Sequence, residues 1–116
     1  MLTVRHMVSA DVEYGDVALE HTAVCFPFDF EVGPADSEGG DIFHVTVATP
    51  AGLANARASS NVISDRNLLL FHDFTWAALE TAVHDIVRRC AHDDWSHACT
   101  LLQRYFRWEY EGMDYR

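Results

Sequence analysis

The sequence has 116 residues, of which 49% are hydrophobic and 22% are charged. A chain of this length and composition can bury an ordinary apolar core, so we predict one domain over residues 1–116 and no general disorder. Eighteen Asp and Glu residues against eight arginines give a net charge of −10. This acidity argues against binding to nucleic acid or to anionic membranes, and it favours a basic protein partner.

The acidic residues are concentrated in the first half of the chain. Residues 1–56 contain nine carboxylates and a single basic residue, Arg5, for a net charge of −8. Two interpretations remain open at this point. The charge either serves solubility alone or forms a surface that attracts a basic partner.

Three cysteines, Cys25, Cys90 and Cys99, occur in irregular spacing without a CxxC pair. The N-terminus lacks the charged and then apolar pattern of a signal peptide, and no stretch approaches the roughly 20 apolar residues of a membrane helix. We therefore expect a reduced, cytoplasmic protein with buried thiols.

The first half of the chain predicts strands. Residues 1–8 alternate loosely and predict an edge strand, whereas residues 9–23 give no clear pattern. Residues 25–33 alternate strictly, which predicts a strand with one buried face. Pro27 favours an edge position or a strand start for this segment. Residues 42–49 predict a second strand. The inward positions of the two strands are Phe26, Phe28, Phe30, Val32, Phe43, Val45 and Val47.

The segment PADSEGGD (34–41) has the composition of a loop, so the two strands form a long hairpin with an acidic connection. Pro50 then begins a short helix, because a proline at the first helical position loses no hydrogen bond. We expect a loop at SSNVISD (59–65) and a short buried strand at LLLF (68–71).

The last third of the chain predicts two amphipathic helices. The first spans residues 73–90 and is capped by Asp73 or Thr75; the second starts at Trp95, after Asp93 or Asp94, and continues to Phe106. Their short connection favours an antiparallel pair. The fold class is therefore α+β, a small antiparallel sheet with an antiparallel helix pair packed on one face.

Motifs for catalysis are weak. No glycine run has the context of a phosphate-binding loop, and Cys99 lies inside a predicted helix without an activating position. Seven histidines are present, and their spacing is poor for metal ligands. We expect no catalytic residue, no metal and no cofactor. The alternative is a small metal-dependent enzyme that uses carboxylates with histidines among His44, His72, His84 and His92.

The order and spacing of several short motifs are informative. EVGP (31–34) precedes a polar glycine-bearing loop, and Thr49-Pro50 is followed by Leu53. The chain ends with Trp95, then Leu102 and Arg104, and then WEYE (108–111). Over roughly residues 25–116 this arrangement resembles the immunity protein 8 family of bacterial polymorphic-toxin systems. The resemblance implies a non-enzymatic protein that binds and neutralises the cognate toxin C-terminal domain, which is encoded beside it. The toxin implied is basic and could be a nuclease.

Two surfaces are candidates for contact with a toxin. The first is the acidic hairpin, with Asp29, Glu31, Asp36, Glu38 and Asp41; its connection has a composition typical of mobile binding loops. The second is the chain end, with Glu109, Tyr110, Glu111, Asp114 and Tyr115, because Tyr is favoured at interfaces. The other role open to Glu109 and Glu111 is solubility or pairing with Arg104 or Arg107.

Trp95 and Trp108 are expected in the core rather than at a contact, where they clamp the final helix onto the sheet. The alternative to an immunity protein is a small acidic adaptor that binds another basic protein. The oligomeric state is open.

Overall fold

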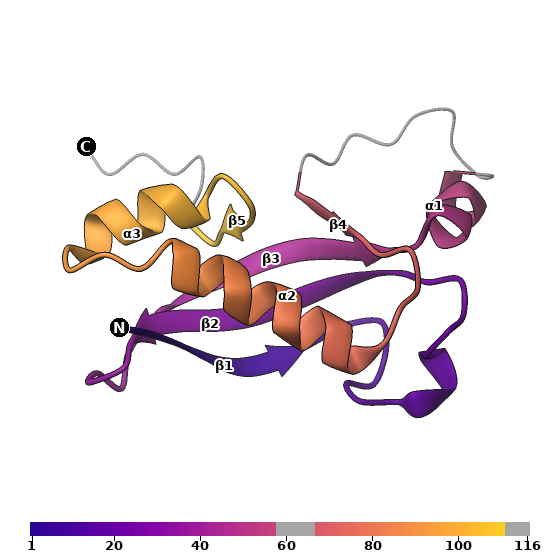
Figure 1. Cartoon of the computed structure of the whole chain (residues 1–116), viewed down its shortest axis with the longest axis horizontal. Helices are drawn as coiled ribbons and strands as arrows, with labels where there is room; N and C mark the ends of the chain where they lie inside the picture. Colours follow the sequence, from indigo (N-terminus) through magenta and orange to yellow (C-terminus); the bar gives the residue numbers. More distant parts are fainter. Residues whose placement is uncertain (58–66, 111–116) are drawn as a thin grey trace.

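The computed structural model describes residues 1–57 and 67–110 (Figure 1). Its elements in chain order are β1 (Leu2–Val8), the 3-10 turn η1 (Val17–Leu19), β2 (Cys25–Pro34), β3 (Asp41–Ala48), α1 (Pro50–Arg57), β4 (Leu68–Leu70), α2 (Trp76–Arg89), α3 (Trp95–Leu102) and β5 (Arg107–Trp108). Strands and helices form separate layers, which confirms the predicted α+β class. None of the described helices is long and apolar enough to cross a membrane.

The sheet has the order β1-β2-β3-β4, and β5 pairs with β3 beside β4. β2 and β3 form the long antiparallel hairpin that the sequence predicts, with Phe28 opposite Val45 and Phe30 opposite Phe43. β1 is an edge strand, as expected. β4 pairs with β3 in parallel, whereas the other pairings are antiparallel.

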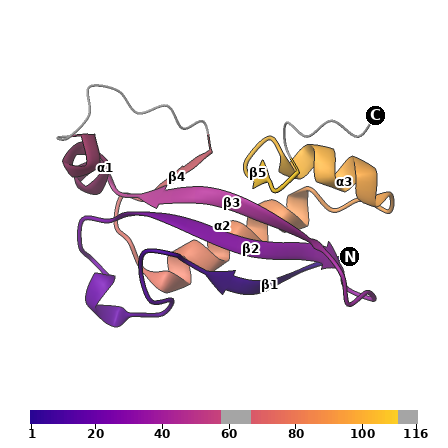
Figure 2. The same ribbon diagram turned by 180° about the vertical axis from the view of Figure 1, so that it is seen from behind.

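One face of the sheet carries the core. The seven inward positions predicted from the alternation of β2 and β3 are all buried, and each is at most 3% exposed. α2 lies across this face, and α3 turns back beside it toward the β3 edge (Figures 1 and 2). The opposite face of the sheet is not covered by a helix of the described chain, as Figure 2 shows.

β1 stays in register with the core through a bulge. Arg5 lies opposite Glu31 and Val8 lies opposite Asp29, so β1 has one more residue than β2 over this stretch. His6 accommodates the extra residue with a left-handed backbone, φ 56°. The bulge shifts Met7 to the core side, where it packs against the hydrophobic cluster.

The helix starts follow their sequence signals. Thr75 caps α2 by accepting a hydrogen bond from the Ala78 amide, and Asp94 caps α3 through the Ser96 amide. The predicted stripe of α2 is buried along its length, from Trp76 to Cys90. α1 starts at Pro50, as predicted.

The expectations for three single segments have different outcomes. Pro27 is the third residue of β2, and β1 ends opposite Asp29, so among the described strands β2 has no neighbour on that side at Pro27, in agreement with the expected edge position or strand start. LLLF does not form a buried strand, since Leu70 is 54% exposed. β4 follows the edge of β3, so only part of each residue is covered. The predicted loop at 59–65 lies outside the described residues.

The last helix is shorter than predicted. α3 ends at Leu102, and the chain then turns so that Phe106 enters the core and contacts Phe30, with ring centroids 4.8 Å apart. Arg107 and Trp108 continue as β5. Trp108 therefore lies in a strand. Burial of Phe106 and pairing with β3 override the helical spacing of the sequence.

Candidate functional site

The uncovered face of the sheet carries the candidate site. Asp29 and Glu31 on β2 alternate with the buried phenylalanines and face away from the core, as predicted, and His44 on β3 lies opposite Asp29. The pairing of β5 with β3 brings the chain end to the same region: Trp108 lies opposite Phe43 and Arg107 lies opposite His44. The hairpin and the chain end, which the sequence presented as two surfaces, therefore form one.

The first residues of the chain end are fixed to the base of the hairpin. The Trp108 indole Nε1 donates a hydrogen bond to Asp41 Oδ2 at 2.9 Å. The Ile42 amide donates to Glu109 Oε1 at 2.8 Å, and the Glu109 amide donates to the Ile42 carbonyl at 3.0 Å. Asp41 and Glu109 thus use carboxylate oxygens to hold β5 in place. Glu109 pairs with a backbone amide instead of with Arg104 or Arg107.

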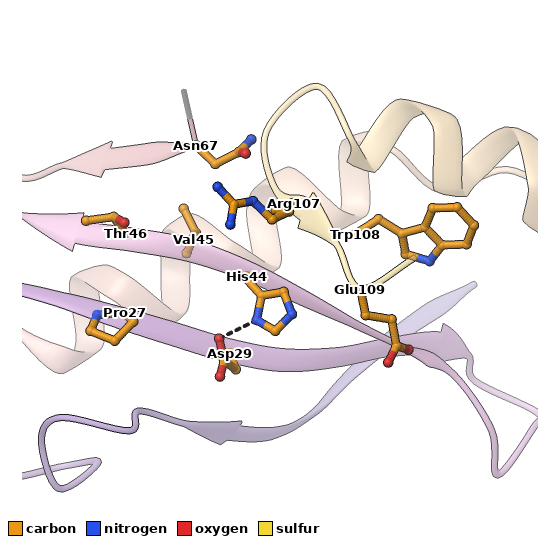
Figure 3. A pocket seen from close by; sticks show the side chains of 9 residues that line it. All are labelled: Pro27, Asp29, His44, Val45, Thr46, Asn67, Arg107, Trp108 and Glu109. Atoms are coloured by element: carbon orange, nitrogen blue, oxygen red, sulfur yellow. Dashed lines mark hydrogen bonds and ion pairs between the residues drawn. The ribbon is translucent and has the colours of Figure 1, made fainter. Parts of the chain in front are cut away.

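A hollow of about 420 Å³ lies at this junction, between β4 and β5 along β3 (Figure 3). Val45 and Pro27 supply apolar surface, and Asp29, His44, Arg107 and Glu109 supply charged or titratable groups. Figure 3 shows the Arg107 side chain between those of Asn67 and His44. His44 Nδ1 lies 2.6 Å from Asp29 Oδ1, so this imidazole is oriented by the carboxylate.

Glu31 is not an available acid. Its Oε1 lies 3.1 Å from Arg5 Nε, and the carboxylate side chain is only 17% exposed. Arg5 also donates to the Ser37 and Gly39 carbonyls, at 3.1 and 3.2 Å. The acidic connection of the hairpin, expected from composition to be mobile, is thus tied to β1. Arg5, the only basic residue among the first 56, was a signal that sequence analysis did not use.

Asp36 and Glu38 are the most accessible of the predicted hairpin acids. Both are exposed in the connection between β2 and β3. Neither forms an ion pair with another residue of the described chain. Tyr110 is 38% exposed and packs edge-on against Trp108. Trp95 and Trp108 are half-buried against the core, between the two roles considered for them. The remaining predicted residues, Glu111, Asp114 and Tyr115, lie outside the described part of the chain.

Sequence analysis missed two residues of this surface, His44 and Arg107. His44 was considered only as a metal ligand, and its position opposite Asp29 follows from the hairpin register alone. Arg107 was considered only as a partner for the terminal acids. The position of Arg107 in the hollow depends on β5, and so does the contact between Trp108 and Asp41. No local sequence pattern indicates that β5 forms.

The described residues offer little for catalysis or metal binding. No group of three or more His, Cys, Asp or Glu side chains among them is arranged to hold a metal ion. His92 and His97 stack face to face with centroids 4.1 Å apart, a geometry that cannot chelate one ion through both rings.

Burial raises the pKa of Cys90 and of Cys99, so both thiols stay protonated. Cys25 is exposed, contrary to the expectation of three buried thiols.

A family model described as immunity protein 8 matches residues 4–115. The searches of curated proteins and of solved structures found no match. The family match covers nearly the whole chain, including β1 from Val4 onward and the segment 9–23, which the motifs did not reach. The chain belongs to the immunity protein 8 family.

Proposed function

We propose that this protein binds the toxin C-terminal domain encoded beside it and neutralises that toxin in the cytoplasm of the producing cell. The observation that carries the proposal is the match of the immunity protein 8 family to residues 4–115. Family membership supports action by binding rather than by catalysis.

The contact surface that we propose is centred on the connection between β2 and β3. Asp36 and Glu38 are exposed there, and Arg5 holds the connection against the sheet. A pre-ordered acidic loop loses less conformational entropy on binding than a loose one. Asp29 and Glu109 extend this surface along the uncovered face, toward the hollow at β5, and Tyr110 is exposed beside Trp108.

The toxin that suits this surface is basic. Enzymes that act on nucleic acid carry positive clefts, so a nuclease is the favoured class. Attraction between a −10 protein and such a cleft speeds association by about 10 to 10³, and salt weakens the effect. The acidic loop would then approach the cleft, where it competes electrostatically with the substrate.

The test is binding to the C-terminal domain of the protein encoded immediately upstream, measured by calorimetry and stopped-flow at two salt concentrations. Tight binding together with inhibition of the toxin supports the function, and no binding overturns it. Asp36→Asn with Glu38→Gln should slow association several-fold at low salt and leave the melting temperature unchanged. Tight binding with an unchanged association rate would keep the function and discard this surface.

A matched control is available at the opposite end of the molecule. Asp11 and Glu13 are exposed in the segment after β1, far along the sheet from the hairpin connection (Figure 1). Asp11→Asn with Glu13→Gln removes the same two charges. A slower association in this control, equal to that of the hairpin variant, would show that net charge acts without a defined surface.

A further inference from the structure

The outer edge of β1 has unused hydrogen-bonding groups. Among the described residues β1 pairs only with β2, so its second edge has no partner strand. The Met1 carbonyl accepts a bond from the Ala35 amide at 2.8 Å, so odd-numbered positions of β1 face β2. Because backbone groups alternate along a strand, the amides and carbonyls of Leu2 and Val4 point outward.

An apolar groove follows the same edge. It lies between β1 and α2, has a volume of about 760 Å³, and is lined by Leu2, Val4, Ala77, Val87 and Ala91. Met1 is 96% exposed at its end. In Figure 1, α2 runs antiparallel to β1 along this side of the molecule. A strand added to β1 would place its alternate side chains in the groove.

The charges around the groove favour a second copy of this chain over a basic partner. Its charged lining residues are Glu80, Asp85 and Arg88, and Asp85 is already paired with Arg88 and Arg89. One of the chain's eight arginines, Arg88, therefore lines the groove and a second, Arg89, pairs with the groove residue Asp85, while the acids of the hairpin connection are not among the lining residues. Mutual repulsion between two −10 chains is weakest where charges of both signs are mixed.

We propose that β1 pairs with β1 of a second copy, antiparallel and about a two-fold axis at Thr3. This register places Leu2 opposite Val4 of the partner subunit and satisfies all the outward backbone groups of Leu2–Arg5 at once. The apolar side chains of Leu2 and Val4 then meet across the axis on the groove side, and the two Thr3 side chains meet on the uncovered face, a favourable pair. The bulge at His6 ends the pairing.

The register also gives the interface self-complementary charges. α2 runs antiparallel to β1 (Figure 1), so the end of α2, which carries Arg88, lies toward the start of β1, and Glu80, nearer the start of α2, lies toward the other end of the groove. The two-fold axis exchanges these ends, which brings Arg88 toward the partner's Glu80, and the same pair recurs on the other side. Four paired residues and one groove are a small contact, so we expect a dimer in the micromolar range.

The first experiment is sedimentation equilibrium of the full chain alone, from low micromolar to submillimolar concentration. We expect a monomer–dimer equilibrium. Val4→Pro removes an amide that β2 does not use and should raise the dimer dissociation constant at least about tenfold while the circular dichroism is kept. A chain that stays monomeric throughout overturns the proposal, and so does a dimer insensitive to Val4→Pro in a folded variant.

A cross-link tests the register even if Val4→Pro fails to fold. At a position on the axis between non-hydrogen-bonded partners the Cα atoms lie about 4.5 Å apart, within disulfide range. Thr3→Cys in a Cys25→Ser background should therefore give a covalent dimer under mild oxidation. The matched control is Thr100→Cys in the same background, exposed on α3. Equal cross-linking of both would contradict the register. A monomeric chain whose toxin binding is weakened by Val4→Pro would assign the edge to the toxin instead.

Discussion

Arg5 and Glu31 face each other across β1 and β2, and their ion pair holds the acidic hairpin connection in place. Arg5 Nε is 3.1 Å from Glu31 Oε1, while the remaining guanidinium nitrogens donate to the Ser37 and Gly39 carbonyls. One guanidinium thus joins two strands and a loop. The planar fork of arginine suits this role, whereas a lysine would supply a single charge at one point.

Replacing Arg5 should both destabilise the fold and loosen the connection. Arg5→Met keeps the apolar stem but leaves Glu31 without its partner, so we expect a loss of about 1–3 kcal/mol in the free energy of unfolding by urea denaturation. Hydrogen exchange of residues 35–40 should become faster. Arg104→Met, at an exposed arginine, is the control and should change stability by less than about 0.5 kcal/mol. Equal losses in both variants would contradict the clamp.

The central hairpin and α2 were predictable because local pattern and tertiary environment agree there. The alternation in β2 and β3 has the period of a strand with one buried face, and the core lies on that face over both strands. In α2 the helical stripe, the Thr75 cap and the final arginines all indicate the same helix. Such agreement lets a short pattern determine structure.

The chain end was not predictable because its structure depends on distant residues. The spacing of Leu102, Tyr105 and Phe106 is helical, but Phe106 is buried against Phe30, more than 70 positions away in sequence. β5 exists through its pairing with Phe43 and His44. Asp29 and Glu31 were correctly placed on the outward face of β2, whereas the Arg5–Glu31 ion pair and the contacts of Glu109 depend on the register of β1 and the course of β5.

Trp108 should contribute less to stability than its size indicates. It is half-buried, so Trp108→Ala should cost about 1–3 kcal/mol, below the 3–5 kcal/mol of a fully buried aromatic residue. Phe106→Ala is the matched comparison: Phe106 is 0% exposed, and its loss should cost about 3–5 kcal/mol. Chemical denaturation of both variants would test this order. A larger cost at Trp108 would mean that the Asp41 contact stabilises much more than one hydrogen bond.

Gly52 should tolerate no side chain. A Cβ at this position in α1 would lie 1.9 Å from the Val24 carbonyl oxygen, a backbone atom that cannot move without shifting β2. Gly52→Ala should therefore destabilise the fold by about 1–3 kcal/mol or more. Gly39→Ala is the control, because its nearest neighbour would be 3.9 Å away, and we expect almost no change. Thermal melts that show equal shifts would contradict the close approach of α1 to β2.

Tyr14 should make the fold sensitive to high pH. Burial raises the pKa of Tyr14 from 10.0 to about 12, and a hydrogen bond and charge repulsion from Glu80 act in the same direction. The folded state therefore holds the phenolic proton more tightly than the unfolded state does. This contribution to stability is fully present below pH 10 and is lost as the pH rises from 10 through 12.

Tyr14→Phe isolates this effect. The phenyl ring keeps the packing against Trp76, whose centroid lies 5.1 Å away, but it has no proton to lose. Wild type should lose stability between pH 9 and pH 11.5 by more than the variant does, as measured by urea denaturation at each pH. Tyr14→Phe removes only the titration of Tyr14, because the other tyrosines and the arginines titrate in both proteins. If the free energy of unfolding falls equally with pH in wild type and variant, burial and Glu80 do not raise the pKa of Tyr14.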